Sequence, residues 1–328
     1  MKEKVLITGA SGFVGYHLIN EALHNNLEVY AAVRKNSRIE HLKGLDIQYI
    51  YLDYANVDAL KAELLDKQIN YIIHGAGATR AVSEAEYNKI NADYTANLAE
   101  AALALGDTLK KFVLISSLAA IGPLKTLDGI ITEDTSPDPI TAYGRSKLLA
   151  EKKLKAINGL NYTILRPTAV YGPRDTGIFI FFKQVSNHLE PYIGNIKQNL
   201  SFVYVTDLAK AAVKALQAGD MKTYNISDGN YYDRHELGTL TKTILNVKTF
   251  KFHLWVIFVK LIAGISQKVS SLSNSAPIIN LEKLDELMAT NWSCSIELAK
   301  QDLGYYPQHA LSEGLRETLQ WYKDNNWI

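Results

Sequence analysis

The sequence has little cysteine and little excess charge, and both absences narrow the possible functions. Cys294 is the single cysteine in 328 residues, which excludes an internal disulfide framework and a cysteine-rich metal site. The formal net charge is +1, so the composition indicates neither a nucleic-acid partner nor a strongly acidic one. An apolar strand pattern begins almost at the first residue and leaves no room for a signal peptide, so we expect a cytoplasmic location.

Long apolar runs are also scarce, and the strongest of them is too short and too interrupted to span a membrane. It covers residues 250–265 and is broken by Lys251, His253 and Lys260, whereas a spanning helix needs about 20 apolar residues. We therefore expect no membrane-spanning segment. Two interpretations stay open for residues 250–265. They form a helix packed over the substrate site or in a subunit contact, or they lie in a membrane interface.

The sequence does have a regular alternation of short apolar runs and helical periodicities in its first half. Strands are predicted at residues 5–7, 28–33, 47–52, 71–74 and 111–115, and helices at residues 16–25, 57–66 and 84–105. This alternation predicts an α/β protein with a Rossmann-type, doubly wound parallel sheet and helices on both faces. Because right-handed crossovers place ligands at the carboxyl ends of such strands, the candidate site residues are sought there.

Three glycines lie where the first predicted strand gives way to a helix. Gly9 permits a tight turn, Gly12 lets the backbone approach a pyrophosphate, and Gly15 lets the helix pack on the strand. The helix N-terminus then offers free N–H groups and the positive end of its dipole to phosphate. The spacing is Gly-x-x-Gly-x-x-Gly rather than Gly-x-Gly-x-x-Gly. Its place between a strand and a helix nevertheless predicts a dinucleotide-binding turn.

The second strand ends in basic side chains, where an NAD-specific site carries Asp or Glu. Val33 is followed by Arg34, and Arg38 lies in the same loop. Guanidinium groups suit bidentate contacts with a 2′-phosphate, so the sequence predicts NADP, with NAD possible. The alternative is a solvated basic loop. At the end of the third strand, Asp53 and Tyr54 are placed near the adenine, although an Asp there also suits a helix cap.

Small residues follow the fourth strand. Gly75, Ala76 and Gly77 let the backbone come close to the cofactor a second time. His74, the last residue of that strand, is predicted to be a packed residue rather than a ligand, because no partner stands at metal-ligand spacing. The sequence therefore predicts a cofactor contact at this strand end and no metal site.

Residues with catalytic character follow the fifth strand. Tyr143 and Lys147 stand at i and i+4 of a predicted helix capped by Thr141, so they share one face. A phenol has a pKa of about 10, and a nearby ammonium favours the phenolate and lowers that pKa. Ser117, in the loop after the strand, is placed to hydrogen-bond a substrate oxygen and hold it against Tyr143. A Tyr-x-x-x-Lys pair alone is common on helices. Here the pair follows a dinucleotide-binding turn and a serine at a strand end along the chain, and this combination predicts that Tyr143 transfers a proton.

Several motifs together resemble the extended short-chain dehydrogenase/reductase superfamily, in its epimerase/dehydratase-like group. They are residues 8–15, 116–117, 143–147, 165–174 and 202–209, and they span most of the first two thirds of the chain. The resemblance implies a catalytic triad of Ser117, Tyr143 and Lys147, and a bracing role for Asn91. It also places Pro167 and Val170 beside the nicotinamide. The predicted cofactor-binding residues are Gly9, Ser11, Gly12, Phe13, Val14, Arg34, Arg38, Asp53, Tyr54, Gly75, Ala76, Gly77, Tyr143, Lys147, Pro167 and Val170.

Two departures from the sugar-nucleotide branch of that superfamily bear on the substrate. Epimerases of that branch usually carry Asn where this chain has Ala169, and commonly Arg where it has Leu200. Both residues contact the nucleotide diphosphate in that branch, so this chain has little to hold two phosphates. The segments at residues 199–205 and 295–307, with residues 313–315 and 321–322, are more similar to the dihydroflavonol reductase and 3β-hydroxysteroid dehydrogenase-like branch.

The resemblance implies an enzyme, and three functions stay open. The first is an NAD(P)-dependent oxidoreductase that transfers a hydride between the nicotinamide and a ketone or secondary alcohol. In it Tyr143 is the general acid or base, Ser117 orients the oxygen, and Lys147 binds the ribose. The second is a sugar-nucleotide epimerase or dehydratase that retains its cofactor. The third is a non-catalytic NADP-sensing protein, and the complete set of three residues argues against it.

The positions of these motifs along the chain predict its division into two parts. We predict a dinucleotide-binding Rossmann domain of residues 1–170 and 202–228, and a smaller substrate-binding part of residues 171–201 and 229–328. The expected partner is a small-molecule substrate. A homodimer is considered, with residues 84–105 as its contact, although an apolar stripe there suits a core face equally well.

Overall fold

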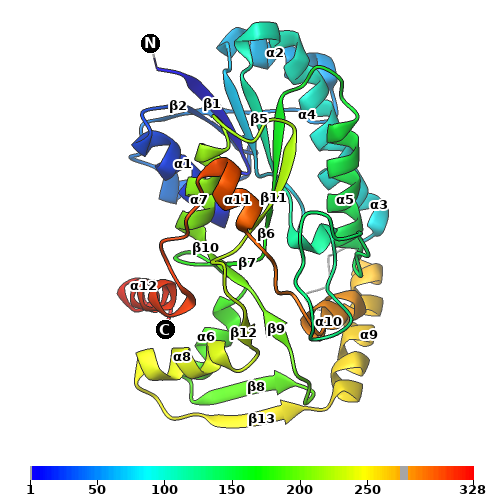
Figure 1. The fold of residues 1–328 in the computed structure, drawn as a ribbon, viewed down its shortest axis with the longest axis vertical. Helices are drawn as coiled ribbons and strands as arrows, with labels where there is room; N and C mark the ends of the chain where they lie inside the picture. The colour runs from blue at the N-terminus through cyan, green and yellow to red at the C-terminus, as the bar shows by residue number, and fades with distance from the viewer. Residues whose placement is uncertain (1, 274–279) are drawn as a thin grey trace.

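The computed structural model describes residues 2–273 and 280–328, and its centre is a seven-stranded sheet (Figure 1). The strand order is β11-β6-β5-β4-β1-β2-β3, and every neighbouring pair is parallel. The order reverses between β1 and β4, which is the point where open α/β sheets bind ligands. The predicted Rossmann-type fold is confirmed. The strands are β1 (Lys4–Thr8), β2 (Glu28–Ala32), β3 (Ile47–Ile50), β4 (Tyr71–His74), β5 (Lys111–Ile115), β6 (Tyr162–Pro167) and β11 (Lys222–Ile226).

Helices cover both faces of this sheet, because its strands are apolar on both sides. Along β1, Val5 and Ile7 belong to one buried cluster and Leu6 to the other, as the period of two in a strand requires. The first cluster includes residues of α1 (Phe13–His24) and α7 (Val205–Lys214). The second includes residues of α2 (Val57–Lys67), α4 (Tyr94–Ala102) and α5 (Ala142–Lys155).

The prediction of one helix over residues 84–105 is wrong. The structure has α3 (Glu84–Tyr87), a π-helical segment (Asn88–Asp93), α4 and a 3₁₀ segment (Leu103–Thr108). Hydrophobic periodicity does not distinguish these turns from an α-helix, whereas the wider π turn lets a side chain point inward. The apolar stripe of this region belongs to the core of the sheet. It therefore lends no support to the dimer contact, which stays a prediction.

Asn91 is the side chain that the π turn directs inward. Its Nδ2 donates to the carbonyl of Ala78 at 3.0 Å and to Oγ of Ser146 at 2.9 Å, and its Oδ1 accepts from N–H of Ala78 at 2.7 Å. Asn91 thus ties the chain after β4 to α5. The bracing contact that the resemblance implied for Asn91 is present.

A smaller layer lies beyond the carboxyl ends of the main strands (Figure 1). Its core contains Tyr171, Phe182, Tyr204, Leu315 and Tyr322, all buried. Within residues 2–273 and 280–328, its strands form three separate two-stranded sheets, and in one of them β7 pairs with β10 in parallel register. Its elements are β7 (Ala169–Tyr171), α6 (Phe179–Ser186), β8 (Leu189–Ile193), β9 (Asn199–Leu200), β10 (Phe202–Tyr204), β12 (Tyr232–Asp233), α8 (Glu236–Leu245), β13 (Phe250–Leu254), α9 (Val256–Ser273), α10 (Leu281–Leu287) and α12 (Leu311–Asp324).

The chain returns to the main sheet near its end. In α11 (Glu297–Leu303), Ala299 and Leu303 are buried in the same cluster as α1 and α7, and Tyr305 joins them. Figure 1 shows α11 beside α7, well away from α12. We keep the predicted division into two parts as a proposal, with residues 296–305 assigned to the dinucleotide-binding part.

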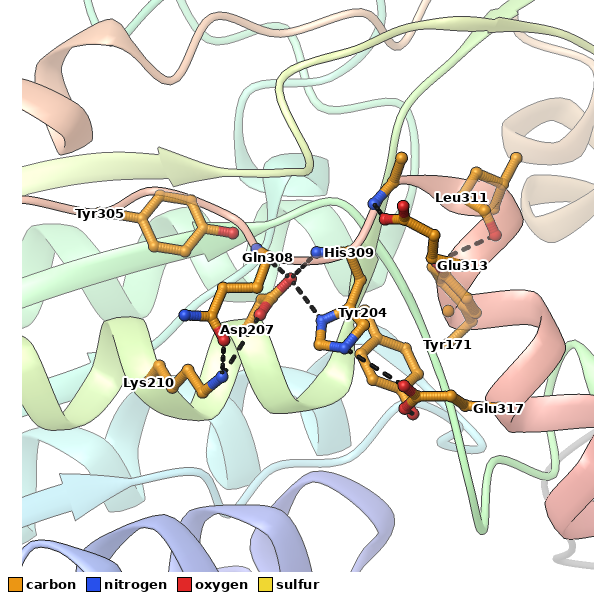
Figure 2. Close-up of polar contacts among 12 residues, drawn as sticks. Tyr171, Tyr204, Asp207, Lys210, Tyr305, Gln308, His309, Leu311, Glu313 and Glu317 are labelled. Atoms are coloured by element: carbon orange, nitrogen blue, oxygen red, sulfur yellow. Dashed lines mark hydrogen bonds and ion pairs between the residues drawn. The ribbon is translucent and has the colours of Figure 1, made fainter.

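Asp207 of α7 holds the following segment in place (Figure 2). Its Oδ2 accepts from the backbone N–H groups of Gln308 at 3.0 Å and His309 at 2.9 Å, and lies 3.1 Å from Nδ1 of His309. Next to it, the Tyr204 hydroxyl donates to Glu317 of α12 at 2.7 Å. The Asp207 carboxylate therefore connects α7 of the main layer to the segment that leads into α12.

Residues 250–265 do not form the single packed helix that the first interpretation expects. Phe250–Leu254 is β13, which pairs in parallel with β8, and α9 begins only at Val256. Most of the large apolar side chains in this segment are exposed, whereas Val259 and Ala263 are buried. Among the described residues, no helix is long and apolar enough to cross a membrane.

Candidate active site

The glycine turn after β1 has the geometry that a bound dinucleotide needs. Gly9 has a φ of +70°, and a Cβ there would lie 2.7 Å from the carbonyl oxygen of Gly75. A Cβ on Gly15 would lie 2.1 Å from the carbonyl oxygen of Gly9, so both positions require glycine. Gly12 is the N-cap of α1 and supplies no capping side chain, which leaves the first N–H groups of the helix for an anion. Ser11, Phe13 and Val14 are half-buried in this turn.

The ends of β1 and β4 are locked together by a buried polar chain. Thr8 Oγ1 lies 2.7 Å from Nδ1 of His74 and accepts from N–H of Ala76 at 3.0 Å, and Nε2 of His74 lies 3.0 Å from Oγ1 of Thr95. Burial lowers the pKa of His74 to about 3, so the imidazole is neutral. The prediction that His74 is a packed residue is confirmed. Its role is to fix the two strand ends between which a dinucleotide would lie.

The N-terminus of α5 brings the predicted catalytic side chains together. Thr141 Oγ1 accepts from N–H of Gly144 at 3.0 Å, so the predicted cap is confirmed. A Cβ on Gly144 would lie 2.3 Å from the carbonyl oxygen of Ala119, which shows how closely the helix approaches the loop after β5. Ser117 begins that loop, and its side chain interacts with the Tyr143 phenol. Tyr143 and Ser117 therefore share one site, as the sequence predicts.

Lys147 lies deeper in the same site. Its Nζ donates to the carbonyl of Ile115 at 2.7 Å, at the end of β5. A Cβ on Gly77 would lie 3.9 Å from this Nζ, so the loop after β4 passes beside it. Burial lowers the pKa of Lys147 to about 8, and the charge of Glu151 works in the opposite direction.

The prediction that Lys147 lowers the pKa of Tyr143 is wrong for this structure. Burial raises the pKa of Tyr143 to about 12, and its interaction with Ser117 offsets only part of that rise. The ammonium of Lys147 is directed at the end of β5, so desolvation of the phenol dominates. Tyr143 is therefore protonated at neutral pH, which is the form that donates a proton.

Sequence reasoning missed an ion pair directly behind this site. Glu151 and Arg166 are buried, with side chains 1% and 5% exposed, and Oε2 of Glu151 accepts from Nη2 of Arg166 at 2.6 Å. Oε1 of Glu151 accepts from Nε of Arg166 at 3.0 Å and from Oγ of Ser116 at 2.5 Å. The one available signal was that Glu151 stands at i+4 from Lys147. The pair joins α5 to β6 and to the residue before Ser117.

The remaining predicted cofactor residues lie around the same edge of the sheet. Arg34 and Arg38 are exposed, and neither forms an ion pair within the part of the chain that the structure describes. Asp53 is exposed and accepts from N–H of Ala55 at 3.1 Å. The alternative that Asp53 caps the next helix is wrong, because Asn56 is the N-cap of α2. Tyr54 stacks on Tyr94, with ring centroids 5.9 Å apart.

The segment after β6 carries the two residues predicted beside the nicotinamide. Pro167 is the last residue of β6 and is buried, and Val170 is half-buried in β7. Between them, Oγ1 of Thr168 is buried without a hydrogen-bond partner in the described part of the chain. Such a hydroxyl is free to serve a polar group of a ligand. Thr168 belongs to the motif at residues 165–174, but no role for it was predicted from the sequence.

A basic cluster beside the glycine turn was also missed. The guanidinium of Arg174 stacks over the ring of Tyr16 at 4.3 Å, and Arg174 lowers the pKa of His41 after the larger effect of burial. His41 also hydrogen-bonds the backbone of Ser11. Arg174 has a φ of +76° and comes from the loop after β7. The cluster forms only because that loop folds back onto α1.

The sheet order, the glycine turn and the grouped serine, tyrosine and lysine define an NAD(P)-dependent enzyme of the extended short-chain dehydrogenase/reductase type. The chain belongs to the NAD dependent epimerase/dehydratase family, whose profile matches residues 5–227. The finer similarity to the dihydroflavonol reductase branch stays a prediction.

Three proteins illustrate the range of similar sequences and structures. A ceramide reductase of Caulobacter vibrioides is 26% identical over 328 residues, covering 99% of this chain and 96% of that protein. A UDP-glucose 4-epimerase of Vibrio cholerae is 27% identical over 349 residues, covering 99% and 97%. The crystal structure of a UDP-glucuronic acid 4-epimerase from Bacillus cereus, in complex with UDP-glucuronic acid and NAD, is 25% identical. It has a TM-score of 0.76 and covers 98% of this chain and 99% of that one.

Proposed function

We propose that the protein is an NAD(P)-dependent oxidoreductase that reduces a ketone to a secondary alcohol on a substrate with a large apolar part. The observation that carries this proposal is the apolar character of two positions. Ala169 is exposed in β7, and Leu200 is half-buried in β9, against the apolar core of the smaller layer. At these positions the chain offers a methyl and an isobutyl group, neither of which binds phosphate. The ceramide reductase relative is consistent with such a substrate.

The residues present fit a nicotinamide dinucleotide. The glycine turn would hold the pyrophosphate at the N-terminus of α1, and the unpartnered Thr168 hydroxyl and Pro167 would lie at the nicotinamide end. When bound, the reduced cofactor supplies the hydride that the carbonyl carbon receives. The roles assigned to Ser117, Tyr143 and Lys147 are part of this proposal.

The proton that completes the reduction comes from Tyr143. The phenol has a pKa of about 12, so it is protonated at neutral pH, and it donates its proton to the carbonyl oxygen of the substrate. The Ser117 hydroxyl hydrogen-bonds the same oxygen and orients it. Lys147 binds the ribose hydroxyls, while Asn91 and Ser146 hold α5 in register with the loop after β4. One hydride and one proton convert the ketone to the alcohol.

A second candidate is nucleotide-sugar epimerisation with a retained cofactor. The comparisons favour this candidate over the first, because UDP-sugar epimerases recur among the curated relatives and the similar crystal structures. It requires Tyr143 to act first as a base on a sugar hydroxyl, and it requires groups that bind a diphosphate. The side chains at positions 169 and 200 do not supply those groups.

Two measurements on the full chain distinguish the candidates. We expect cofactor oxidation with long-chain ketone lipids or keto steroids, and no thermal stabilisation by UDP-sugars beyond that from the cofactor. A ligand at about 100 times its Kd adds about 2.7 kcal/mol to the free energy of unfolding, which a melting curve detects. A clear shift with a UDP-sugar, together with its conversion to an epimer, would replace the first candidate by the second.

Cofactor choice gives a separate prediction, and we expect tighter binding of NADP(H) than of NAD(H). A charge-assisted hydrogen bond contributes about 1.5 to 3 kcal/mol. Arg34 and Arg38 are exposed, so the two contacts contribute less than this full value. A binding free energy of about 1.4 kcal/mol corresponds to a tenfold change in Kd, so we expect the affinity for NADP(H) to exceed that for NAD(H) by about tenfold or more. Arg34→Ala reduces the preference, and the double variant with Arg38→Ala reduces it further.

Calorimetric titration of both cofactors checks this preference. Arg316→Ala, which removes an exposed arginine of α12, is the matched control and leaves both affinities unchanged. The preference also weakens at high salt, as exposed charge pairs do. Equal affinities, or tighter binding of NAD, would mean that Arg34 and Arg38 belong to a solvated loop.

A further inference from the structure

The surface formed by β13 and the first half of α9 is unusually apolar. Its large side chains are 41–73% exposed, a continuous run that monomeric soluble proteins rarely present. We call this surface the apolar face. Figure 1 shows α9 at the outer edge of the smaller layer, beside α10. The members of the apolar face are Phe250, Leu254, Trp255, Ile257, Phe258, Leu261, Ile262 and Ile265.

The pattern along α9 is that of an amphipathic helix turned outward. Phe258, Ile262 and Ile265 follow one another at helical spacing and are 61–64% exposed. On the opposite side of the helix, Val259 is 8% exposed and Ala263 is fully buried. The inner side of α9 is thus already packed, so the exposed side is not needed for the core.

Charge within the segment that forms this face has one sign, whereas the neighbouring α10 carries Glu282, Asp285 and Glu286. Of these, Glu282 pairs with Arg145 and Glu286 with Lys283. From residue 237 to residue 281 the sequence contains no Asp or Glu, but it contains five lysines. Lys251 and Lys260 are exposed within the apolar face itself, together with His253. A surface that combines apolar side chains with lysines is complementary to anionic lipid headgroups above an acyl layer. A second copy of the same face, joined by two-fold symmetry, would bring lysines against lysines, and the face itself has no carboxylate to pair with them.

We propose that the apolar face docks the protein onto the surface of an anionic lipid bilayer, with α9 lying in the interface. Trp255 and the two phenylalanines of the face supply rings of the kind that settle at the headgroup level. The lysines remain at the phosphates, while Ile257, Leu261 and Ile262 enter the acyl boundary. The docking does not depend on which reaction the site performs.

The apolar face adjoins the catalytic helix through α10. This helix packs on α9, and Glu282 within it accepts from N–H of Ala142 at 2.7 Å and from Nη2 of Arg145 at 2.8 Å. Ala142 immediately precedes Tyr143. Docking would therefore place the site near the membrane surface, where substrates with long apolar chains reside.

Flotation of the full chain with lipid vesicles tests the docking. The probes are vesicles of phosphatidylcholine with and without phosphatidylglycerol. We expect the wild type to float with the anionic vesicles. We expect the affinity of the triple variant Trp255→Gln, Phe258→Gln, Ile262→Gln for these vesicles to be lower by at least about tenfold. Tyr306→Gln is the matched control, because Tyr306 is 70% exposed on the loop after α11, and it binds like the wild type. Added salt weakens the binding.

Three results would overturn the docking. They are no flotation of the wild type, equal flotation of the triple variant, or a wild-type dimer that the triple variant converts to a monomer while neither binds vesicles. The last result would make a second copy the occupant of the face. Cofactor oxidation with a water-soluble ketone is measured in parallel, and we expect the triple variant to retain it. Loss of docking is thereby distinguished from failure of the proposed reaction.

Discussion

Tyr143→Phe is expected to lower kcat by about 10² to 10⁴ while the fold and the cofactor affinity are retained, because general acid catalysis contributes a factor of that size. The phenol interacts with the side chain of Ser117, and with a pKa that burial raises to about 12 it holds its proton at neutral pH. The phenylalanine ring fills the same space, so only the proton is lost. Steady-state cofactor oxidation with an active ketone measures the effect, and calorimetry measures cofactor affinity.

The neighbouring Tyr87 provides the matched control. Its ring centroid lies 6.2 Å from that of Tyr143, but its hydroxyl donates to the backbone carbonyl of Thr79 at 3.2 Å. Tyr87→Phe should therefore leave kcat near the wild-type value. Near-full turnover by Tyr143→Phe would remove Tyr143 from the reaction, and an equal loss in both variants would point to packing rather than proton transfer.

The largest effect on stability is expected from Glu151→Gln, which breaks the buried pair with Arg166. Removing one partner leaves an uncompensated charge in the interior, which costs about 3–5 kcal/mol. The side chains of the pair are 1% and 5% exposed, so water does not replace the lost partner. Denaturant unfolding, read as the free energy of unfolding, measures the loss.

A surface pair between α5 and the π-helical segment controls for the loss of a charge as such. Lys153 and Asp93 lie 2.6 Å apart, but their side chains are 39% and 47% exposed. Asp93→Asn should cost no more than about 1 kcal/mol, the range of exposed ion pairs. The double variant Glu151→Gln, Arg166→Met should recover most of the loss, because it leaves no buried charge. A cost for Glu151→Gln as small as that for Asp93→Asn would contradict the prediction.

Patterns among neighbouring residues predicted the main sheet and the first elements of the candidate site. The strand and helix alternation, the glycine turn, the Thr141 cap and the i, i+4 spacing of Tyr143 and Lys147 depend on neighbours along the chain. The structure confirms the sheet and the cap, and it groups Ser117 with Tyr143. The steric demand at Gly15 is equally local, because the turn itself brings the carbonyl of Gly9 close, whereas the contact of Gly9 with Gly75 comes from the loop after β4. The local features are readable because no distant segment decides them.

Other features were decided by segments far away in the chain. The Glu151–Arg166 pair joins a helix to a strand, and Asp207 meets residues about a hundred positions later, so neither is visible as a spacing. The raised pKa of Tyr143 follows from burial that several elements produce together. The π turn around Asn91 depends on the loop after β4, and periodicity predicted an unbroken helix in its place.

The sequence by itself thus determined a parallel α/β sheet with a dinucleotide turn and a serine, tyrosine and lysine at its strand ends. Only the tertiary structure decided which charges are buried and which apolar side chains stay outside. Residues 250–265 show the difference most clearly, since their composition suits a packed helix and also a membrane interface. The packing of Val259 and Ala263 against the protein leaves Phe258 and Ile262 in solvent. Burial is a property of the surroundings, and the surroundings come from the whole chain.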